Sequence, residues 1–400
     1  MKRVAGLDVH KDTIFACVKK GKYQSDVKEF GTTTSELEEL FHWLQGERVA
    51  KVAMESTSTY WIPVWRALEQ EFKLYLVNPY FIKQMPGRKT DVKDAQWIAT
   101  LLDKNMLKSS VVPEKQIRVL RGYLRRYAQL QGQLTRCYQS MERHLSLCNI
   151  KIASLTSKIG SKTVLNVVQE IIAGQTAPEE LIKVVHGRVV NSKGQQTVMK
   201  ALTGIIEGHD EFMLGQIFED YQHIERQCKE LLAQAEKIAD DYYQKEIDLL
   251  QTIPGIKKLS AVIVFAEIGG EVNMFKTAQN LTGWCGLSPK NDESAGKIKS
   301  NRIGKGNKYL RRILVQVAWA ASRTKDCYLK DKFEKLSIRK GSKKALIAIA
   351  RKQLVIIWNV LNKMEEYKEP EIILTEKQLA SKKAYYTKKL EQLKANEKVG

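Results

Sequence analysis

The chain has 400 residues, and its 66 Lys and Arg residues against 45 Asp and Glu residues give a formal net charge of +21 and a sequence pI of about 9.5. This length allows two or three domains, and the charge excess is too large for ordinary solubility and indicates a polyanionic partner. Six cysteines show no C-x-x-C pair or metal-finger spacing, no apolar run approaches the roughly 20 residues of a membrane span, and strand-like sequence directly follows Met1, so we expect a soluble cytoplasmic protein without a signal peptide.

The first feature of the chain is a short apolar run over residues 4–9, rich in β-branched side chains, which predicts a buried strand. Asp8 lies inside this run, and a buried carboxylate is unfavourable unless it is paired or binds a metal. Residues 13–19 follow across a three-residue connection and are the expected hairpin partner.

Alternating strand and helix patterns continue to about residue 112. The expected elements are a strand at 27–30, a helix at 35–44 capped by Ser35, a strand at 49–54 ending in Glu55, a helix at 61–72, a strand at 74–77 and a helix at 90–102 capped by Thr90. This order predicts an α/β domain with a mixed sheet over residues 1–112.

Two long heptad patterns occupy residues 113–247. Apolar side chains step by three and four from Ile117 to Cys148, with only Gln131 breaking the seam, and again from Leu214 to Tyr242. They flank a short, mostly helical insert at about 151–210. The two helices fit an antiparallel hairpin within one chain and pairing with another subunit equally well.

The third block, residues 248–365, begins with a Pro254-Gly255 turn that leads into an apolar helix at 259–268. Helix, Pro-Gly turn and helix form the helix-hairpin-helix pattern, whose backbone N–H groups can bind a DNA phosphate, although a plain helical turn has the same signature. Residues 301–350 contain fourteen Lys and Arg against three Asp and Glu, which favours nucleic acid over a merely solvated surface. The tail from 366 is charged and is expected to be a peripheral helix or disordered.

Four carboxylates in the first domain suggest a metal site: Asp8, Glu55, Asp91 and Asp94. Asp91 and Asp94 share one face of a helix's first turn, where favourable charge placement alone would explain them. Adjacent strands and an overlying helix could nevertheless bring all four together as the hard oxygen ligands that Mg²⁺ prefers. Two such ions about 4 Å apart could activate a nucleophile and stabilise the leaving oxygen in phosphodiester cleavage.

A second group of motifs lies in the third block, at 286–289, 293–297 and 302–312. Ser294 lies on a small-residue turn followed by basic side chains that could hold a phosphate, although most loop serines are simply turn residues. The expected contacts to nucleic acid are Lys89, Lys93, Gly255, Lys257, Lys297, Arg302, Lys305, Lys308, Arg311 and Arg312.

Three segments resemble the RuvC-like DEDD domain of bacterial insertion-sequence transposases of the insertion sequence one-hundred-ten family. They are Gly6-Leu7-Asp8-Val9-His10-Lys11-Asp12, Ala53-Met54-Glu55-Ser56-Thr57 and residues 89–95. Three further segments resemble the family's C-terminal domain. They are residues 253–256, residues 286–289, and the stretch from Ser-x-Gly-Lys through Arg-Ile-Gly-Lys-Gly-Asn-x-Tyr-Leu-Arg-Arg. The match covers most of residues 1–360, and the order of the motifs is more specific than any one of them. Ala295 departs from the pattern, which commonly has a second glycine there.

The resemblance implies an RNase H-like domain, a coiled-coil dimerisation domain and a serine transposase domain in a recombinase that mobilises its own DNA element. It implies that Asp8, Glu55, Asp91 and Asp94 bind Mg²⁺, that Ser294 forms a phosphoserine link to DNA, and that a bridge RNA pairs with donor and target DNA. Ser288 and Ser300 are the weaker candidates for the nucleophile. The expected assembly is a homodimer that forms a tetramer on DNA, with an active site shared between protomers.

Two other functions fit parts of the sequence. A RuvC-like, Holliday-junction-type nuclease without RNA guidance would use only the four acids, and a non-enzymatic basic protein would only bind nucleic acid. We also expect a raised pKa on at least one of the clustered acids. Finally, two long helices between Asp94 and Ser294 would span tens of Å at 1.5 Å per residue, which predicts that one protomer does not fold its serine onto its own carboxylates.

Overall fold

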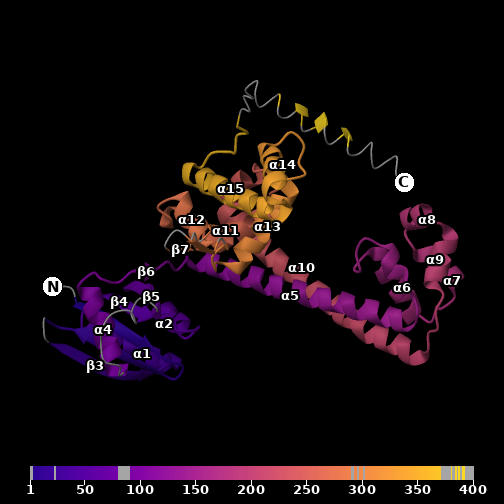
Figure 1. Ribbon diagram of the computed structural model, residues 1–400. Coiled ribbons are helices and arrows are strands. Elements are labelled where there is room, and N and C mark those ends of the chain that lie inside the picture. The colour runs from indigo at the N-terminus through magenta and orange to yellow at the C-terminus, as the bar shows by residue number, and fades with distance from the viewer. Residues whose placement is uncertain are drawn as a thin grey trace. The chain divides into compact units, whose positions relative to one another are not determined.

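A computed structural model describes residues 3–21, 24–79, 91–289, 292–294, 297–300 and 302–370, with a few residues of the tail, and gives the backbone alone at 91–92, 292–294 and 297–300 (Figure 1). The chain divides into two compact units, Met1–Pro113 and Glu114–Gly400.

The N-terminal unit is built on a mixed sheet, as predicted. Its strands in the described residues are β1 (Arg3–Val9), β2 (Thr13–Lys19), β3 (Ser25–Gly31), β4 (Val49–Glu55), β5 (Lys73–Val77) and β6 (Ser109–Ser110), in the order β3-β2-β1-β4-β5-β6. β1 pairs antiparallel with β2, confirming the hairpin, and parallel with β4. The sequence did not predict β6, because two residues are too few to show an alternating pattern.

In the part of this unit that the structure describes, the helices that pack on the sheet are α1 (Thr34–Gly46), α2 (Trp61–Leu68) and α4 (Asp91–Asp103). The expected cap Ser35 is wrong, because Thr33 caps α1 in a capping box in which the Glu36 carboxylate accepts from the Thr33 N–H at 2.9 Å. α2 ends at Leu68 and not at Phe72 as predicted, and the buried Phe72 follows in a bend, where its N–H donates to Leu68 O at 3.1 Å. The predicted cap Thr90 lies outside the described residues.

The second unit contains the two heptad helices, α5 (Lys115–Leu147) and α10 (Gly208–Gln251), which pair with each other as an antiparallel hairpin. Their apolar seams face one another through residues such as Leu134 and Tyr221. Gln131, the polar break in the seam, places its Nε2 3.7 Å from the Cys228 sulfur. The structure thus decides in favour of pairing within one chain.

The insert between these helices is mostly helical, as predicted. It consists of α6 (Lys162–Ile172), α7 (Pro178–Leu181), η1 (Ile152–Leu155), η2 (Ile182–Val184), α8 (Gly187–Lys193) and α9 (Gln195–Leu202). Val167, Val168 and Ile171 of α6 form a small core with Leu145 of α5 and Leu214 of α10. The insert is therefore packed onto the end of the helical hairpin.

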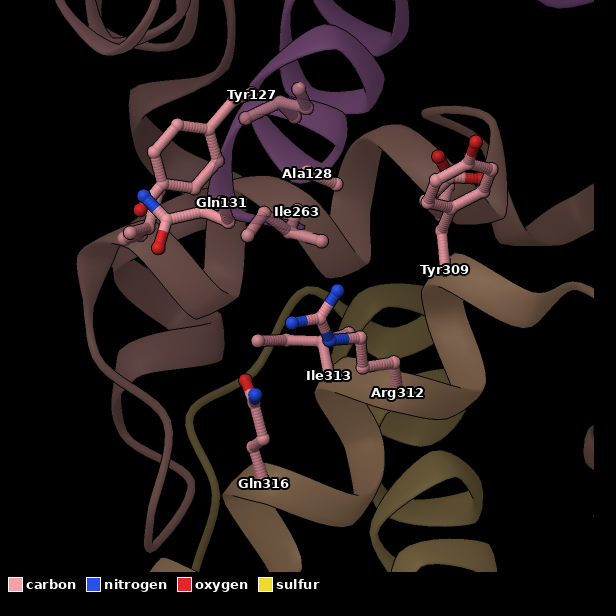
Figure 2. Close-up of a pocket in the computed structure, with 11 residues that line it drawn as sticks. Tyr127, Ala128, Gln131, Ile263, Tyr309, Arg312, Ile313 and Gln316 are labelled. Carbon is pink, nitrogen blue, oxygen red and sulfur yellow. The ribbon is translucent and has the colours of Figure 1, made fainter. Parts of the chain in front are cut away.

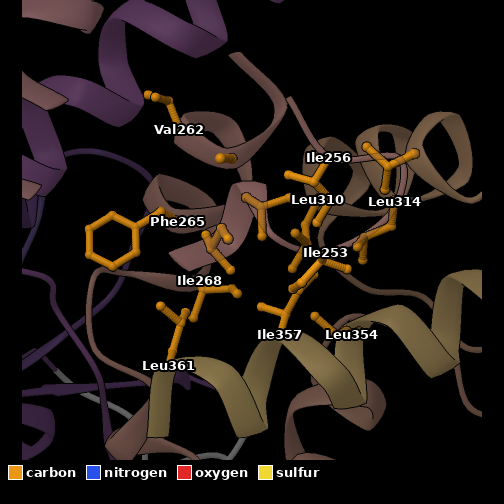
Figure 3. Close-up of a cluster of buried hydrophobic side chains, with 14 of the residues drawn as sticks. Ile253, Ile256, Val262, Phe265, Ile268, Leu310, Leu314, Leu354, Ile357 and Leu361 are labelled. Atoms are coloured by element: carbon orange, nitrogen blue, oxygen red, sulfur yellow. The ribbon is translucent and has the colours of Figure 1, made fainter. Parts of the chain in front are cut away.

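The C-terminal part of this unit is a helical domain with one small sheet. Its elements are α11 (Lys258–Ile268), η3 (Val272–Met274), α12 (Ala278–Trp284), β7 (Asp292–Ser294), β8 (Lys297–Ser300), α13 (Lys308–Ala321), α14 (Tyr328–Lys340) and α15 (Ser342–Lys363). Phe265, Leu314 and Leu354, labelled in Figure 3, come from three of these helices and belong to one buried cluster. Ile117 and Leu124, at the start of α5, belong to the same core.

The pairing of α5 with α10 removes helix length as the reason to expect that one protomer does not fold its serine onto its own carboxylates, which stays a prediction. α10 returns toward the start of α5, where the Tyr243 hydroxyl donates to the Glu114 carboxylate, so the outer ends of the two helices are not separated by the helices' length. The heptad pattern could not reveal this, because an apolar seam specifies a complementary surface and not the chain that supplies it.

Among the described helices, α15 alone is long and apolar enough to cross a membrane. Ile349, Leu354 and Ile357 on this helix are fully buried in the core of the C-terminal domain. The apolar character of α15 is therefore explained by its place in this core.

Candidate active site

Two of the predicted carboxylates end neighbouring strands of the N-terminal sheet. β1 and β4 run parallel with Leu7 opposite Met54, so Asp8 and Glu55 follow at the same level. Asp8 is buried, with 6% of its surface exposed, and Glu55 is half-buried. The two carboxylates therefore lie at one edge of the sheet, as the sequence predicted.

Asp94 completes this cluster from the first turn of α4. Burial raises the pKa of the Asp8 carboxyl, the nearby charges of Glu55 and Asp94 raise it further, and His10 opposes them. His10 Nε2 lies 3.2 Å from Asp8 Oδ2. The predicted raised pKa is thus confirmed at Asp8, and its electrostatic causes show that three of the four carboxylates converge.

Gly6 explains how α4 comes so close to β1. A Cβ atom on this residue would lie 2.4 Å from the carbonyl oxygen of Ala95 and 2.4 Å from the backbone nitrogen of Ala99. Strand and helix therefore touch backbone to backbone, which only glycine permits. This contact, two residues before Asp8, holds the first turn of α4 and Asp94 beside the strand.

The donor set fits a hard divalent cation. Asp8, Glu55 and Asp94 offer only oxygen atoms from three separate elements, and their mutual repulsion is what a cation would relieve. Glu55 Oε1 also accepts a hydrogen bond from Thr57 Oγ1 at 3.2 Å, which orients that carboxylate. Asp91 begins the same helix as Asp94, but its side chain lies outside the described residues.

The second predicted group lies in the other unit, around a small β-hairpin. Ser294 is the last residue of β7 and pairs with Lys297 of β8 across the two-residue connection. The sequence did not predict these strands, because three or four residues show little alternation. Ser300 pairs with Asp292 at the far end of the hairpin, and Ser288 lies outside it with its Oγ 3.3 Å from Thr282 Oγ1.

Two glycines allow close contact between the segments before and after this hairpin. Gly286 has φ +75°, and a Cβ atom on it would lie 2.8 Å from the Gly304 carbonyl oxygen. A Cβ atom on Gly306 would lie 2.3 Å from the Cys285 carbonyl carbon. Residues 286–289 and 302–307 therefore pack main chain against main chain and hold both ends of the hairpin.

A buried carboxylate that the sequence reading missed organises this region. Glu267 is 1% exposed and accepts two hydrogen bonds from Arg125, at 2.9 and 2.8 Å, and one from Asn307 Nδ2 at 2.6 Å. Asn307 Oδ1 in turn accepts the Tyr309 and Leu310 N–H groups and caps α13. Glu267 is the only acid in the apolar run 259–268, and a single acid in an apolar run is the same pattern that identified Asp8.

A cavity of about 240 Å³ borders this network between α5, α11 and α13. Figure 2 shows Arg312 and Gln316 of α13 on one side of it and Tyr127 of α5 on the other. The cavity is thus lined by apolar side chains such as Ile263 and by the exposed guanidinium of Arg312.

The predicted nucleic-acid contacts fall into three groups. Lys93, Lys257, Arg302, Lys305, Lys308 and Arg312 are exposed. Arg311 donates to the Gly304 carbonyl at 3.2 Å and so stabilises its own loop. Gly255 has φ +86° and packs against α13, since a Cβ atom would lie 2.4 Å from the Val317 carbonyl oxygen. Lys89 lies outside the described residues, and Lys297 is described by its backbone alone.

Comparison with known proteins gives two family matches in chain order. A model for DEDD transposases, described as "Transposase", matches residues 5–150, and one described as "Transposase IS116/IS110/IS902 family" matches residues 247–334. The first covers the carboxylate cluster and the second covers the hairpin, Glu267 and the basic loop.

Three curated relatives carry related names. The chain is 32% identical over 157 residues to the transposase for insertion sequence element IS1111A of Coxiella burnetii, covering 35% of this chain and 41% of that protein. It is 28% identical over 164 residues to the putative transposase y4pF/y4sB of Sinorhizobium fredii, covering 38% and 40%. It is 24% identical over 326 residues to the probable family 20 transposase of Pseudomonas aeruginosa, covering 79% and 85%. The first two alignments span about two fifths of the relatives' length.

Proposed function

Because this chain belongs to the IS116/IS110/IS902 family of insertion-sequence transposases, we propose that it is a DNA recombinase that excises and inserts its own element. The observation that carries the proposal is the convergence of buried Asp8 with Glu55 and Asp94 at one edge of a mixed sheet. We assign the N-terminal unit an RNase H-like fold, and the net charge of +21 supports DNA as the substrate.

Asp8, Glu55, Asp91 and Asp94 are the proposed ligands for Mg²⁺. When bound there, the ion would act as a Lewis acid on the scissile phosphate. The protein's own part is to hold the ligands: the Gly6 contact places Asp94 beside Asp8, and His10 orients the Asp8 carboxylate through its 3.2 Å contact.

Ser294 is the proposed nucleophile. Its Oγ forms a bond to phosphorus, the phosphodiester P–O bond to the adjoining nucleotide breaks, and the Oγ proton passes to a base while the departing oxygen takes up a proton. The position of Ser294 at the end of β7 supports this role, and the exposed Arg302, Lys305 and Lys308 would neutralise the phosphate.

A denaturation-resistant protein–DNA adduct tests this function directly. Wild-type protein with donor DNA, guide RNA and Mg²⁺ should form an adduct that survives boiling in detergent, and Ser294→Ala should form none. Ser288→Ala and Ser300→Ala serve as matched controls and should retain the adduct. An adduct that persists in Ser294→Ala and disappears in one of the controls would transfer the role to that serine.

We further propose that a discrete RNA encoded by the element guides the protein, which works in the cytoplasm as a homodimer that assembles into a tetramer on DNA. Six free cysteines, five of them buried, fit a reducing compartment. The purified protein should carry RNA, and binding should weaken about 10³-fold or more between 50 and 200 mM salt if six or more phosphates are contacted. Filter binding over a salt series measures this, and sequencing identifies the RNA. Random fragments together with RNA-independent recombination would refute guidance alone.

The two rival functions explain less of the chain. A Holliday-junction-type nuclease would use the carboxylates but would leave Ser294 and the interlocked motifs around it without a role. A non-enzymatic nucleic-acid binder would leave the repelling cluster of Asp8, Glu55 and Asp94 unexplained. Neither rival forms a covalent adduct, so the serine experiment separates all three.

A further inference from the structure

A second group of metal-binding side chains lies far along the sequence from the carboxylates, where the α5–α10 hairpin carries the helical insert. His144 and Cys148 are four residues apart at the end of α5 and so share one face of it. Asp210 stands opposite, in the first turn of α10. One ligand atom from each of these three residues lies within 4.8 Å of the other two.

Two imidazole nitrogens lie close to one oxygen of the Asp210 carboxylate. Its Oδ1 lies 3.0 Å from His144 Nε2 and 3.3 Å from His209 Nε2. Nitrogen and oxygen ligands with bonds of about 2.0 Å to zinc stand about 3.3 Å apart in a tetrahedron. Each of the two imidazole nitrogens therefore stands from this oxygen at nearly the distance that separates two ligands of one zinc ion.

The Asp210 carboxylate is fixed in this position by the backbone. Its other oxygen, Oδ2, accepts the Glu207 N–H at 3.0 Å as part of the capping box that begins α10. The helix cap thus occupies one oxygen and presents the other to the two histidines. Cys148 and Asp210 are both buried, whereas His209 is largely exposed and closes the group from the solvent side.

We propose that His144, Cys148, His209 and Asp210 bind a structural zinc ion. One sulfur, two nitrogen and one oxygen ligand suit zinc, whereas Mg²⁺ prefers oxygen ligands throughout. The site is separate in sequence and in chemistry from the Asp8 cluster. It uses none of the C-x-x-C spacings that mark a zinc finger, so no local sequence pattern predicts it.

The position of the group indicates what the ion does. The insert leaves α5 and returns to α10 at this point, where the Lys151 N–H donates to Ala201 O at 2.7 Å and the Ile205 N–H donates to Cys148 O at 3.0 Å. A zinc ion would close the loop of roughly 60 residues between Cys148 and Asp210, which is an effective way to stabilise a chain. The expected role is to fasten the insert to the end of the hairpin.

Full-length protein without an affinity tag tests the proposal. After reconstitution with zinc in excess Mg²⁺, which occupies oxygen-only sites, elemental analysis should find about one zinc per chain. Co²⁺ in place of zinc should give visible bands of tetrahedral geometry and a near-ultraviolet thiolate band. Cys148→Ser should remove the thiolate band and most of the zinc, while Cys228→Ser, a buried cysteine on α10, should keep both.

His209→Ala keeps the test decisive if Cys148→Ser fails to fold. This side chain is 69% exposed, so its removal should leave helicity unchanged by circular dichroism and weaken zinc binding at least tenfold. Chelation of the wild-type protein should lower its melting temperature and expose the insert to proteolysis. Wild-type protein that retains no zinc overturns the proposal, as does zinc or a thiolate band that is unaffected in folded Cys148→Ser and His209→Ala.

Discussion

Replacing Asp8 by Asn is expected to abolish DNA strand cleavage while leaving the fold intact. A bound metal contributes several kcal/mol to such reactions, and each 1.36 kcal/mol is a factor of ten in rate, so the loss should be about 10³-fold or more. Asn preserves the shape of the side chain but offers a neutral, weaker ligand. Single-turnover formation of the serine–DNA adduct in Mg²⁺ measures the effect.

Asp103→Asn is the matched control for this variant. Asp103 lies at the opposite end of α4 from Asp94 and pairs with Lys19 at 2.8 Å, away from the carboxylate cluster. Its loss should leave the cleavage rate within a few-fold of wild type, because surface ion pairs contribute little. Near-wild-type recombination by Asp8→Asn would refute the metal site.

The same variant has a stability signature that depends on pH. The pKa of Asp8 is raised in the folded protein, so its favourable contribution is complete below the unfolded pKa and is lost as pH rises through the folded pKa. Without metal, Asp8→Asn should therefore melt at or above the wild-type temperature at neutral pH. Mg²⁺ should raise the melting temperature of the wild type but not of the variant, which differential scanning fluorimetry can follow.

Mixed dimers of Asp8→Asn and Ser294→Ala chains should form the adduct although neither variant does so alone. The proposal of a shared active site now rests on family resemblance, since the returning α5–α10 hairpin removes the argument from spacer length. If the site is shared, a mixed dimer contains one complete site, made from the serine of one chain and the carboxylates of the other. If each chain builds its own site, a mixed dimer contains none.

Two different affinity tags allow the mixed dimers to be isolated, and a size difference shows which chain carries the DNA. The label should appear only on the Asp8→Asn chain, because that chain alone retains Ser294. Homodimers of each variant provide the background. Verified mixed dimers that stay unlabelled under conditions where wild-type dimers react would assign both halves of the site to one chain.

Much of the N-terminal unit could be predicted because its signals are local. The apolar runs around Asp8 and Glu55 identified two strands, and the parallel pairing of those strands brings the two acids to one edge. Asp94 followed from the start of a helix. The cap of α1 was misplaced at Ser35, because Thr33, Thr34 and Ser35 are all good capping residues. Only the hydrogen bond that the Thr33 N–H donates to the Glu36 carboxylate selects Thr33.

The parts that could not be predicted depend on contacts between distant segments. The Arg125–Glu267–Asn307 network joins residues that are 142 and 40 positions apart, so no local pattern describes it. The same holds for the approach of His144 to Asp210. Short strands such as β7 are decided by the glycine-rich loops that they connect, which carry no periodicity of their own.

The contact at Gly6 has a consequence for how this site can vary. Because β1 and α4 meet atom against atom in the main chain, the gap between Asp8 and Asp94 is set by the thickness of two polypeptide backbones, which is the same whatever the surrounding sequence. Even one methyl group at position 6 would move the helix and carry its acids away from the sheet. The backbone contact therefore sets the separation of the proposed metal ligands. Core side chains elsewhere in the sheet can change without altering that separation, provided that position 6 remains glycine.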